Sequence, residues 1–232
     1  MTDLDRTVVL SALEAGYENL TAAVSGLGDA EMMRPSRCAG WAVADVLYHQ
    51  LLDARRALRA FATPSASPAD RDYVSYWREF SPSGNSDFAP ESDGSAAHAR
   101  HVRIVASAYP PGMLAWEWSE TSRAACRAAR ACPHEAVETQ GHVLTTVDFV
   151  ATLVVEAAVH YLDVTLRLAG APPPDQASLR LVREVLAGLL GERLPADWDD
   201  VTSALKGTGR EPLSEDDLRR LGSLAARFPL FG

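Results

Sequence analysis

The sequence of 232 residues has little positive charge: it contains a single lysine, Lys206, and its 22 basic side chains are outnumbered by 31 acidic ones. The formal net charge is −9. A globally acidic chain lacks the positive surface that releases counterions from nucleic acid or from an anionic membrane. We therefore expect neither nucleic acid nor a membrane among its partners.

The sequence also lacks a long uninterrupted apolar run and a basic leader segment. Its richest apolar stretch, residues 149–168, is broken by Glu156, His160 and Asp163, so no membrane span is expected. The N-terminus carries acids where a signal peptide carries bases. These absences predict a cytoplasmic protein.

Cysteine is scarce as well. The three cysteines, Cys38, Cys126 and Cys132, form no CxxC pair, which argues against a disulfide framework and against a cysteine zinc cluster. We expect three reduced, unreactive thiols.

Apolar residues recur at three- and four-residue steps over most of the chain, as is typical of amphipathic helices. The pattern and its stop signals predict helices over the first 25 residues, 41–61, two pieces within 96–131 split at Pro110 and Pro111, 145–169, 178–190, and after Ser214. Strand signal is weak, and the segments 142–147 and 199–205 fit short strands or helix edges equally well. Residues 63–95, rich in Ser, Pro, Asp and Gly, predict a long loop or lid.

These elements predict an all-α fold. Residues 1–170 are expected to form a helical bundle, and residues 171–232, which begin just before three consecutive prolines, a small and mainly helical C-terminal extension. In such bundles, ligand and metal sites are built from inward-facing side chains of neighbouring helices.

One predicted helix carries a candidate metal-binding pair. Glu156 and His160 stand four residues apart, so their side chains share one helix face. Carboxylate oxygen and imidazole nitrogen both bind zinc and similar divalent ions. His49, in the middle of an otherwise apolar helix where a polar head needs a partner, is the natural third ligand. Three protein ligands leave coordination positions open, as catalytic sites do.

The same residues also fit a solvent-facing stripe without function. His49 lies one turn from Asp45 and from Asp53, and either carboxylate can satisfy it. Polar side chains recur along the second helix at the steps of an exposed face: Asp148, Thr152, Glu156, His160, Asp163 and Arg167. The spacing alone leaves both interpretations open.

Further candidates lie outside this set. His98 and His101 are spaced to chelate, but neighbouring arginines favour a solvated helix start. His142, just before the helix over 145–169, is the candidate for binding a cofactor at the mouth of the site. The GTGR segment at 207–210 lacks the spacing of a phosphate loop, and its Arg210 is the candidate catalytic residue that anchors a substrate carboxylate.

Two segments together resemble a known family. GWAVADVLYHQLLDARRA and, later, TLVVEAAVHYLDVTLRLAG closely resemble the mycothiol-dependent maleylpyruvate isomerase N-terminal domain family of the DinB-like superfamily. The positions that match its two motifs are Gly40, Trp41, Asp45 and His49, then Glu156, His160 and Asp163. The resemblance covers roughly residues 5–170. It implies a DinB-like four-helix bundle in which His49, Glu156 and His160 hold a divalent metal, typically zinc, and it implies mycothiol as a cofactor.

The sequence departs from the family at two places. Ala42 stands where the family usually has a Thr or Ser that caps the helix. The isomerase itself carries a mixed α/β C-terminal domain with an arginine near the active site, whereas residues 171–232 are predicted to be helical here. Arg210 is the residue of this chain that we expect to stand in for that arginine.

The leading functional hypothesis is a metal-dependent enzyme that uses a low-molecular-weight thiol. The metal would lower the pKa of the thiol, and the thiolate would attack a small electrophile, giving isomerisation or S-conjugation. Asp163 and Asp45 are expected to orient His160 and His49. A metal-dependent hydrolase without thiol and a non-catalytic binding or regulatory module are the alternatives. The chain is expected to be a monomer or a homodimer.

Overall fold

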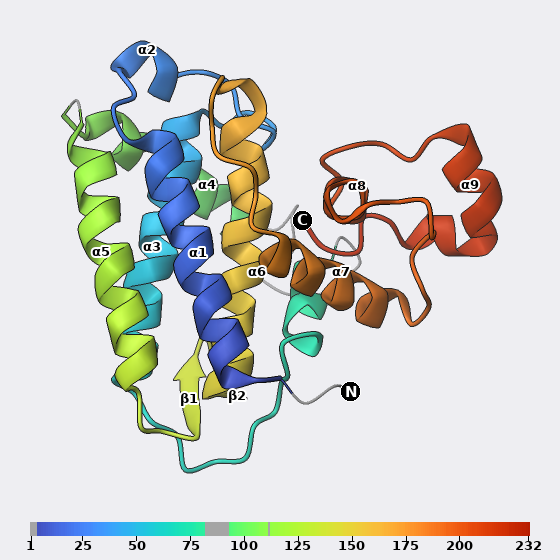
Figure 1. Ribbon diagram of the computed structural model, residues 1–232, viewed down its shortest axis with the longest axis horizontal. Coiled ribbons are helices and arrows are strands. Elements are labelled where there is room, and N and C mark those ends of the chain that lie inside the picture. The colour runs from blue at the N-terminus through green and yellow to red at the C-terminus, as the bar shows by residue number, and fades with distance from the viewer. Residues whose placement is uncertain (1–3, 82–92, 111) are drawn as a thin grey trace.

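The computed structural model describes residues 4–81, 93–110 and 112–232. Four long helices form a bundle: α1 (Arg6–Val24), α3 (Val43–Phe61), α5 (Met113–Ala131) and α6 (Thr146–Val164). Helices α1 and α3 each pack against both α5 and α6, so the four helices close a ring around one core (Figure 1). The prediction of an all-α bundle is confirmed.

Helix α6 is the most deeply buried of the four. Thr145 caps it, its hydroxyl accepting a hydrogen bond from the backbone N–H of Asp148 at 3.0 Å. Sixteen of the 19 residues of α6 are buried, including Thr152, His160 and Asp163, so the helix does not carry a continuous solvent-facing stripe. By length and composition alone the segment 146–167 resembles a membrane span, but most of it is buried inside the bundle, as in the core helix of a soluble domain.

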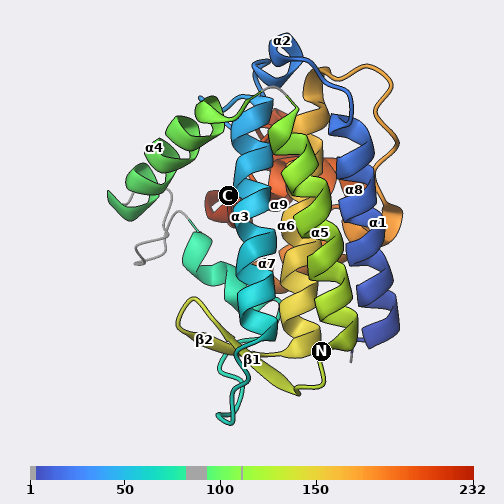
Figure 2. The ribbon, with the colours of Figure 1, turned by 90° about the vertical axis from the view of Figure 1, so that its left-hand side faces the viewer.

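Smaller elements flank the bundle: α2 (Asp29–Met32), the 3-10 helix η1 (Ser75–Phe80) and α4 (Asp93–Ala108). Helix α4 packs against α3 and stands at the side of the bundle (Figure 2). The predicted loop over 63–95 is thus partly structured, because η1 buries Tyr76 and Trp77. Residues 82–92 of that loop lie outside the described residues.

A short antiparallel hairpin connects α5 to α6. Strand β1 (Ala136–Thr139) pairs with β2 (His142–Thr145), so one of the two ambiguous segments is a strand. The turn at Gln140 and Gly141 has positive φ at both positions, 47° and 79°, as a two-residue hairpin turn of matching twist requires. The hairpin positions the start of α6.

The C-terminal extension packs directly on the bundle. It contains α7 (Gln176–Leu190), α8 (Asp200–Gly207), α9 (Glu215–Leu221) and the 3-10 helix η3 (Gly222–Arg227). Helix α7 lies against α6 and α1, and α8 lies against α7 (Figure 1). The second ambiguous segment is therefore helical. Before the extension, α6 ends at Val164, earlier than predicted, and the 3-10 helix η2 (Thr165–Arg167) follows it.

Candidate metal centre

Two bundle helices bring the predicted ligand set together. His49 lies on α3, and Glu156 and His160 lie one turn apart on the facing surface of α6. The Nε2 atoms of both histidines converge on the same oxygen, Oε1 of Glu156, at 2.8 Å from His49 and 3.3 Å from His160. One potential ligand atom from each of the three residues lies within 4.8 Å of the others.

The electrostatics of this group suit a cation. Burial opposes ionisation of Glu156, but the hydrogen bonds and charges of His160 and His49 outweigh it and hold the pKa of Glu156 well below its ordinary value. Two imidazole nitrogens and one carboxylate oxygen, converging in a partly buried place, are a donor set that zinc accepts. The residues present therefore fit the metal that the resemblance implies, although binding itself stays a prediction.

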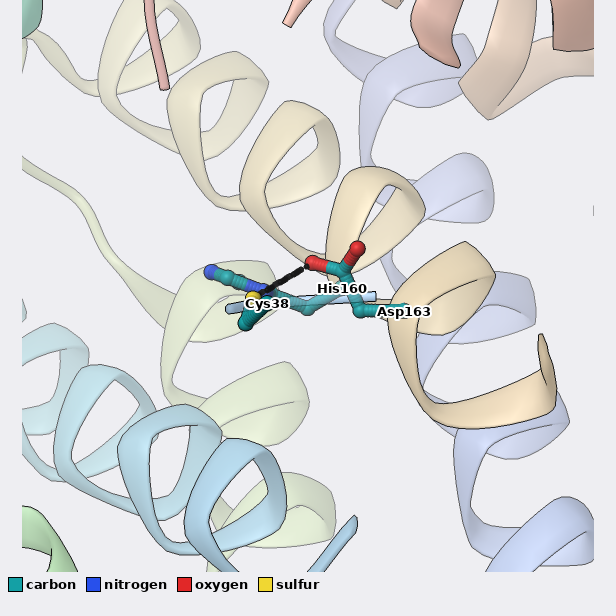
Figure 3. A group of neighbouring side chains, drawn as sticks. All are labelled: Cys38, His160 and Asp163. Carbon is teal, nitrogen blue, oxygen red and sulfur yellow. Dashed lines mark hydrogen bonds and ion pairs between the residues drawn. The ribbon is translucent and has the colours of Figure 1, made fainter. Parts of the chain in front are cut away.

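Asp163 contacts the side of the His160 ring that faces away from Glu156. Its Oδ2 lies 2.9 Å from Nδ1 of His160, and because an ionised carboxylate only accepts, Nδ1 carries the proton and Nε2 faces Glu156. The thiol of Cys38 also donates to Oδ2, at 3.0 Å, and its sulfur lies 3.9 Å from Nδ1 of His160 (Figure 3). The predicted role of Asp163 in orienting a ligand is supported by this geometry.

Arg210 reaches this carboxylate from the C-terminal extension. Its Nη2 donates to Oδ2 of Asp163 at 3.1 Å, and its Nη1 donates to the backbone oxygen of Thr208 at 3.0 Å. Gly209 turns the chain here with φ +72°, a conformation that favours glycine. Arg210 thus lies at the site, as the sequence predicted, but most of its donors are bound to the protein itself.

The arrangement around His49 differs from the expectation. Asp45 does not orient it; its carboxylate instead accepts the backbone N–H of Ala42 at 2.8 Å, which is the half of a capping box that does not need a Thr or Ser at position 42. The Nδ1 atom of His49 faces Nε2 of His98 on α4, at 3.1 Å. His101 lies further along α4, 3.5 Å from the hydroxyl of Tyr48, and is not part of the group.

A cavity of about 840 Å³ opens onto the three candidate ligands. Its walls come from α3, α4, α6, η1 and the C-terminal segment, so both the bundle and the extension build it. Trp77 of η1 and Phe231 stack with ring centroids 4.6 Å apart and form an aromatic wall. Residues of the predicted lid therefore line the cavity as a packed wall.

The cavity is rich in arginine although the chain as a whole is acidic. Three of the four arginines that line it are already paired with a carboxylate: Arg55 with Glu117, Arg56 with Asp53 and Arg210 with Asp163; Arg59 is the fourth. Within the described residues, Nε of Arg56 and Oδ2 of Asp53 are buried and have no hydrogen-bond partner. Arg56 pairs with Asp53 only through Nη2, at 3.0 Å. Nε of Arg56 and Oδ2 of Asp53 are closed off from the open cavity, so a ligand there would have to contact the other atoms of these side chains.

His142 lies apart from the candidate ligands. It is the first residue of β2, and its ring contacts Glu79 at 2.9 Å and Asp70 at 3.4 Å. It is not among the residues that line the cavity. A role for His142 in cofactor binding stays a prediction without a contact to support it.

Sequence reasoning missed two residues of the site, Cys38 and Arg56, and considered His98 only as a chelator together with His101. All three cysteines were expected to be unreactive; Cys38 is partly exposed and lines the cavity, whereas Cys126 and Cys132 are buried. Arg56 follows Asp53 by three residues on the face of α3 that bears His49, and this spacing was an available signal. Nothing in the sequence places His98 against His49.

Comparison with known proteins identifies a family. The sequence model described as "Mycothiol maleylpyruvate isomerase N-terminal domain" matches residues 13–165, which span the four bundle helices almost completely. No curated protein and no solved structure matches the chain significantly.

Proposed function

This chain belongs to the mycothiol maleylpyruvate isomerase N-terminal domain family, and from that premise we propose that it is a metal-dependent enzyme acting on a small anionic electrophile with a low-molecular-weight thiol. The observation that carries the proposal is the convergence of His49, Glu156 and His160 on one wall of a cavity whose other walls bear four arginines. The metal would activate the thiol, and the arginines would bind the anionic electrophile.

His49, Glu156 and His160 would hold the metal, and zinc is the ion we favour for this donor set. When bound, such an ion lowers the pKa of a thiol so that the thiolate is present at neutral pH. Asp163 keeps the proton of His160 on Nδ1, and Arg210 holds Asp163 in place. Mycothiol, which the family description names, is the proposed thiol.

The arginines bind and orient the electrophile. Arg56 and Arg59 line the cavity and are placed to hold a carboxylate within it. The aromatic wall of Trp77 and Phe231 excludes water on another side. A carboxylate held in this way fixes the distance between the reacting carbon and the thiol.

Two reactions share this arrangement. In the first, the thiolate forms an S–C bond to an activated alkene, the π pair moves onto the adjacent carbonyl, and rotation followed by loss of the thiolate restores an isomerised double bond. In the second, the S–C bond remains and a leaving group departs with its electron pair. The first reaction regenerates the thiol, whereas the second consumes one equivalent.

The test measures metal content and thiol dependence together. We expect about one zinc ion per chain by mass spectrometry, and turnover of an alkene carboxylate such as maleylpyruvate only when mycothiol is added. His160→Ala and Glu156→Gln should lose both properties, while His134→Ala, in the turn after α5, should keep them. Turnover without thiol would indicate a hydrolase; absence of bound metal with unchanged variants would indicate a binding module. Either result would overturn the proposal.

A further inference from the structure

His49, one of the two candidate histidine ligands, has a partner outside the four-helix bundle. Nε2 of His98, on α4, lies 3.1 Å from Nδ1 of His49, and the two rings meet edge to face with centroids 5.3 Å apart. Trp41 flanks both, its ring centroid 5.6 Å from that of His49 and 6.5 Å from that of His98. The nitrogen of His49 that faces away from Glu156 is thus specifically contacted.

The chemistry of imidazole defines what this contact does. A neutral histidine that offers the lone pair of Nε2 to a cation carries its remaining proton on Nδ1. An acceptor at Nδ1 fixes that proton and the orientation of the ring. Nε2 of a neutral His98 is such an acceptor. His98 would therefore serve His49 as Asp163 serves His160, with a neutral acceptor in place of a charged one.

Other assignments for His98 fit less well. The potential ligand groups found among the described residues contain His49, Glu156 and His160, or Cys38, His160 and Asp163, and neither contains His98. Asp45, the carboxylate that spacing offered to His49, is occupied by the backbone N–H of Ala42. Positioning of a ligand, rather than ligation, is what the geometry supports.

We propose that His98 is a positioning residue that accepts a hydrogen bond from Nδ1–H of His49 and so holds Nε2 of His49 toward the cation. The inference rests on the metal site of the proposed function. It also gives α4 a role: this helix packs mainly against α3, and the contact of His98 links the position of α4 to a candidate ligand.

The experiment measures zinc affinity by competition with a chromogenic chelator, using metal-free wild-type protein and three variants. We expect His98→Ala to weaken zinc binding about 10-fold, the lower end of the range for lost outer-shell partners, because His98 is exposed. His98→Gln should restore most of the affinity, since an amide oxygen also accepts. His101→Ala, one turn further on the same helix, should bind as the wild type does.

A spectroscopic readout separates positioning from a general effect on the helix. In zinc-loaded protein labelled with ¹⁵N-histidine, the Nδ1–H of His49 should be protected from exchange, and His98→Ala should remove that protection. Equal zinc affinity of wild type and His98→Ala, or an equal loss in His101→Ala, would overturn the inference while leaving the metal site standing. A wild-type protein that binds no zinc would overturn both proposals.

Discussion

Arg210 and Asp163 form a two-pronged ion pair between the C-terminal extension and α6. Nε of Arg210 lies 3.2 Å from Oδ1 of Asp163, and Nη2 lies 3.1 Å from Oδ2. Asp163 is completely buried and also contacts Nδ1 of His160, at 2.9 Å. The extension is therefore connected to a candidate metal ligand through one carboxylate.

The pair should contribute strongly to stability. Arg210→Gln removes one of the two cationic partners of a buried carboxylate and leaves only His160, which costs up to about 3–5 kcal/mol. We expect a loss of that size in the free energy of unfolding measured with urea. Arg123→Gln is the control, because it breaks an exposed pair with Glu120 that contributes below about 1 kcal/mol. Similar losses in the two variants would contradict the assignment.

Asp163 should also make stability depend on pH. Burial alone would raise the pKa of Asp163, but the hydrogen bond from His160 and the charge of Arg210 hold it far below the ordinary value. The unfolded chain, with an aspartate pKa of about 3.9, then binds the proton more readily, so this carboxylate stabilises the fold above that pH and the stabilisation is lost as pH falls toward the folded pKa.

The measurement compares metal-free wild type with Asp163→Asn. The difference between their free energies of unfolding should shrink as the pH is lowered from about 5 to about 2. In this pH range, His160 is protonated in the folded wild type. Burial lowers the pKa of its imidazole, but hydrogen bonds with Asp163, Cys38 and Glu156 outweigh burial and raise that pKa. A difference that stays constant down to the acid end would show that Asp163 is not held ionised.

The bundle and the three candidate ligands were accessible from sequence for a definite reason. Periodicity fixes the buried face of the segment that carries His49. Helix α6 is buried on nearly every side, so Glu156 and His160 were singled out by their spacing and by the resemblance to the family motif. Packing α3 against α6 then brings the ligands together. The hairpin was missed in part because β1 has only four residues, too few for a periodic signal.

The hydrogen-bond partners of the candidate ligands could not be predicted from the sequence in the same way. Spacing offered Asp45 to His49, but a residue in the first turn of a helix also reaches back to the free backbone N–H groups, and that use prevailed. The pairing of His98 with His49 depends on how α4 is placed on α3. The contact of Arg210 with Asp163 depends on a turn that follows α8, which local sequence does not orient toward α6.

Arg56 should govern the affinity for an anionic ligand. Its side chain lines the cavity together with Arg59 and Glu156 and carries charge-assisted hydrogen-bond donors. Loss of one charge-assisted hydrogen bond costs about 1.5–3 kcal/mol, so Arg56→Gln should weaken the binding of maleate to the zinc-loaded protein by about 10-fold or more in calorimetry.

Two companion variants make this result specific. Arg56→Lys keeps the charge that faces Asp53 and should lose less affinity than Arg56→Gln. Arg123→Gln removes an arginine from the exposed surface of α5 and should bind maleate as the wild type does. Unchanged maleate affinity of Arg56→Gln would show that Arg56 does not bind the anion.

The packing of the extension predicts opposite effects at two helical glycines. A Cβ on Gly207, at the end of α8, would lie 2.6 Å from both terminal methyl carbons of Leu186, which is fully buried on α7 and has no room to move. Gly207→Ala should therefore destabilise the protein by about 1–3 kcal/mol.

At Gly16, inside α1, the nearest atoms to an added Cβ lie 3.8 Å away. Gly16→Ala should stabilise by up to about 1 kcal/mol, because alanine favours the helix. Thermal unfolding of the two variants should thus shift in opposite directions. Stabilisation by Gly207→Ala would show that α8 does not pack on α7 as closely as described, and destabilisation by Gly16→Ala would show that α1 has no room for the added methyl group.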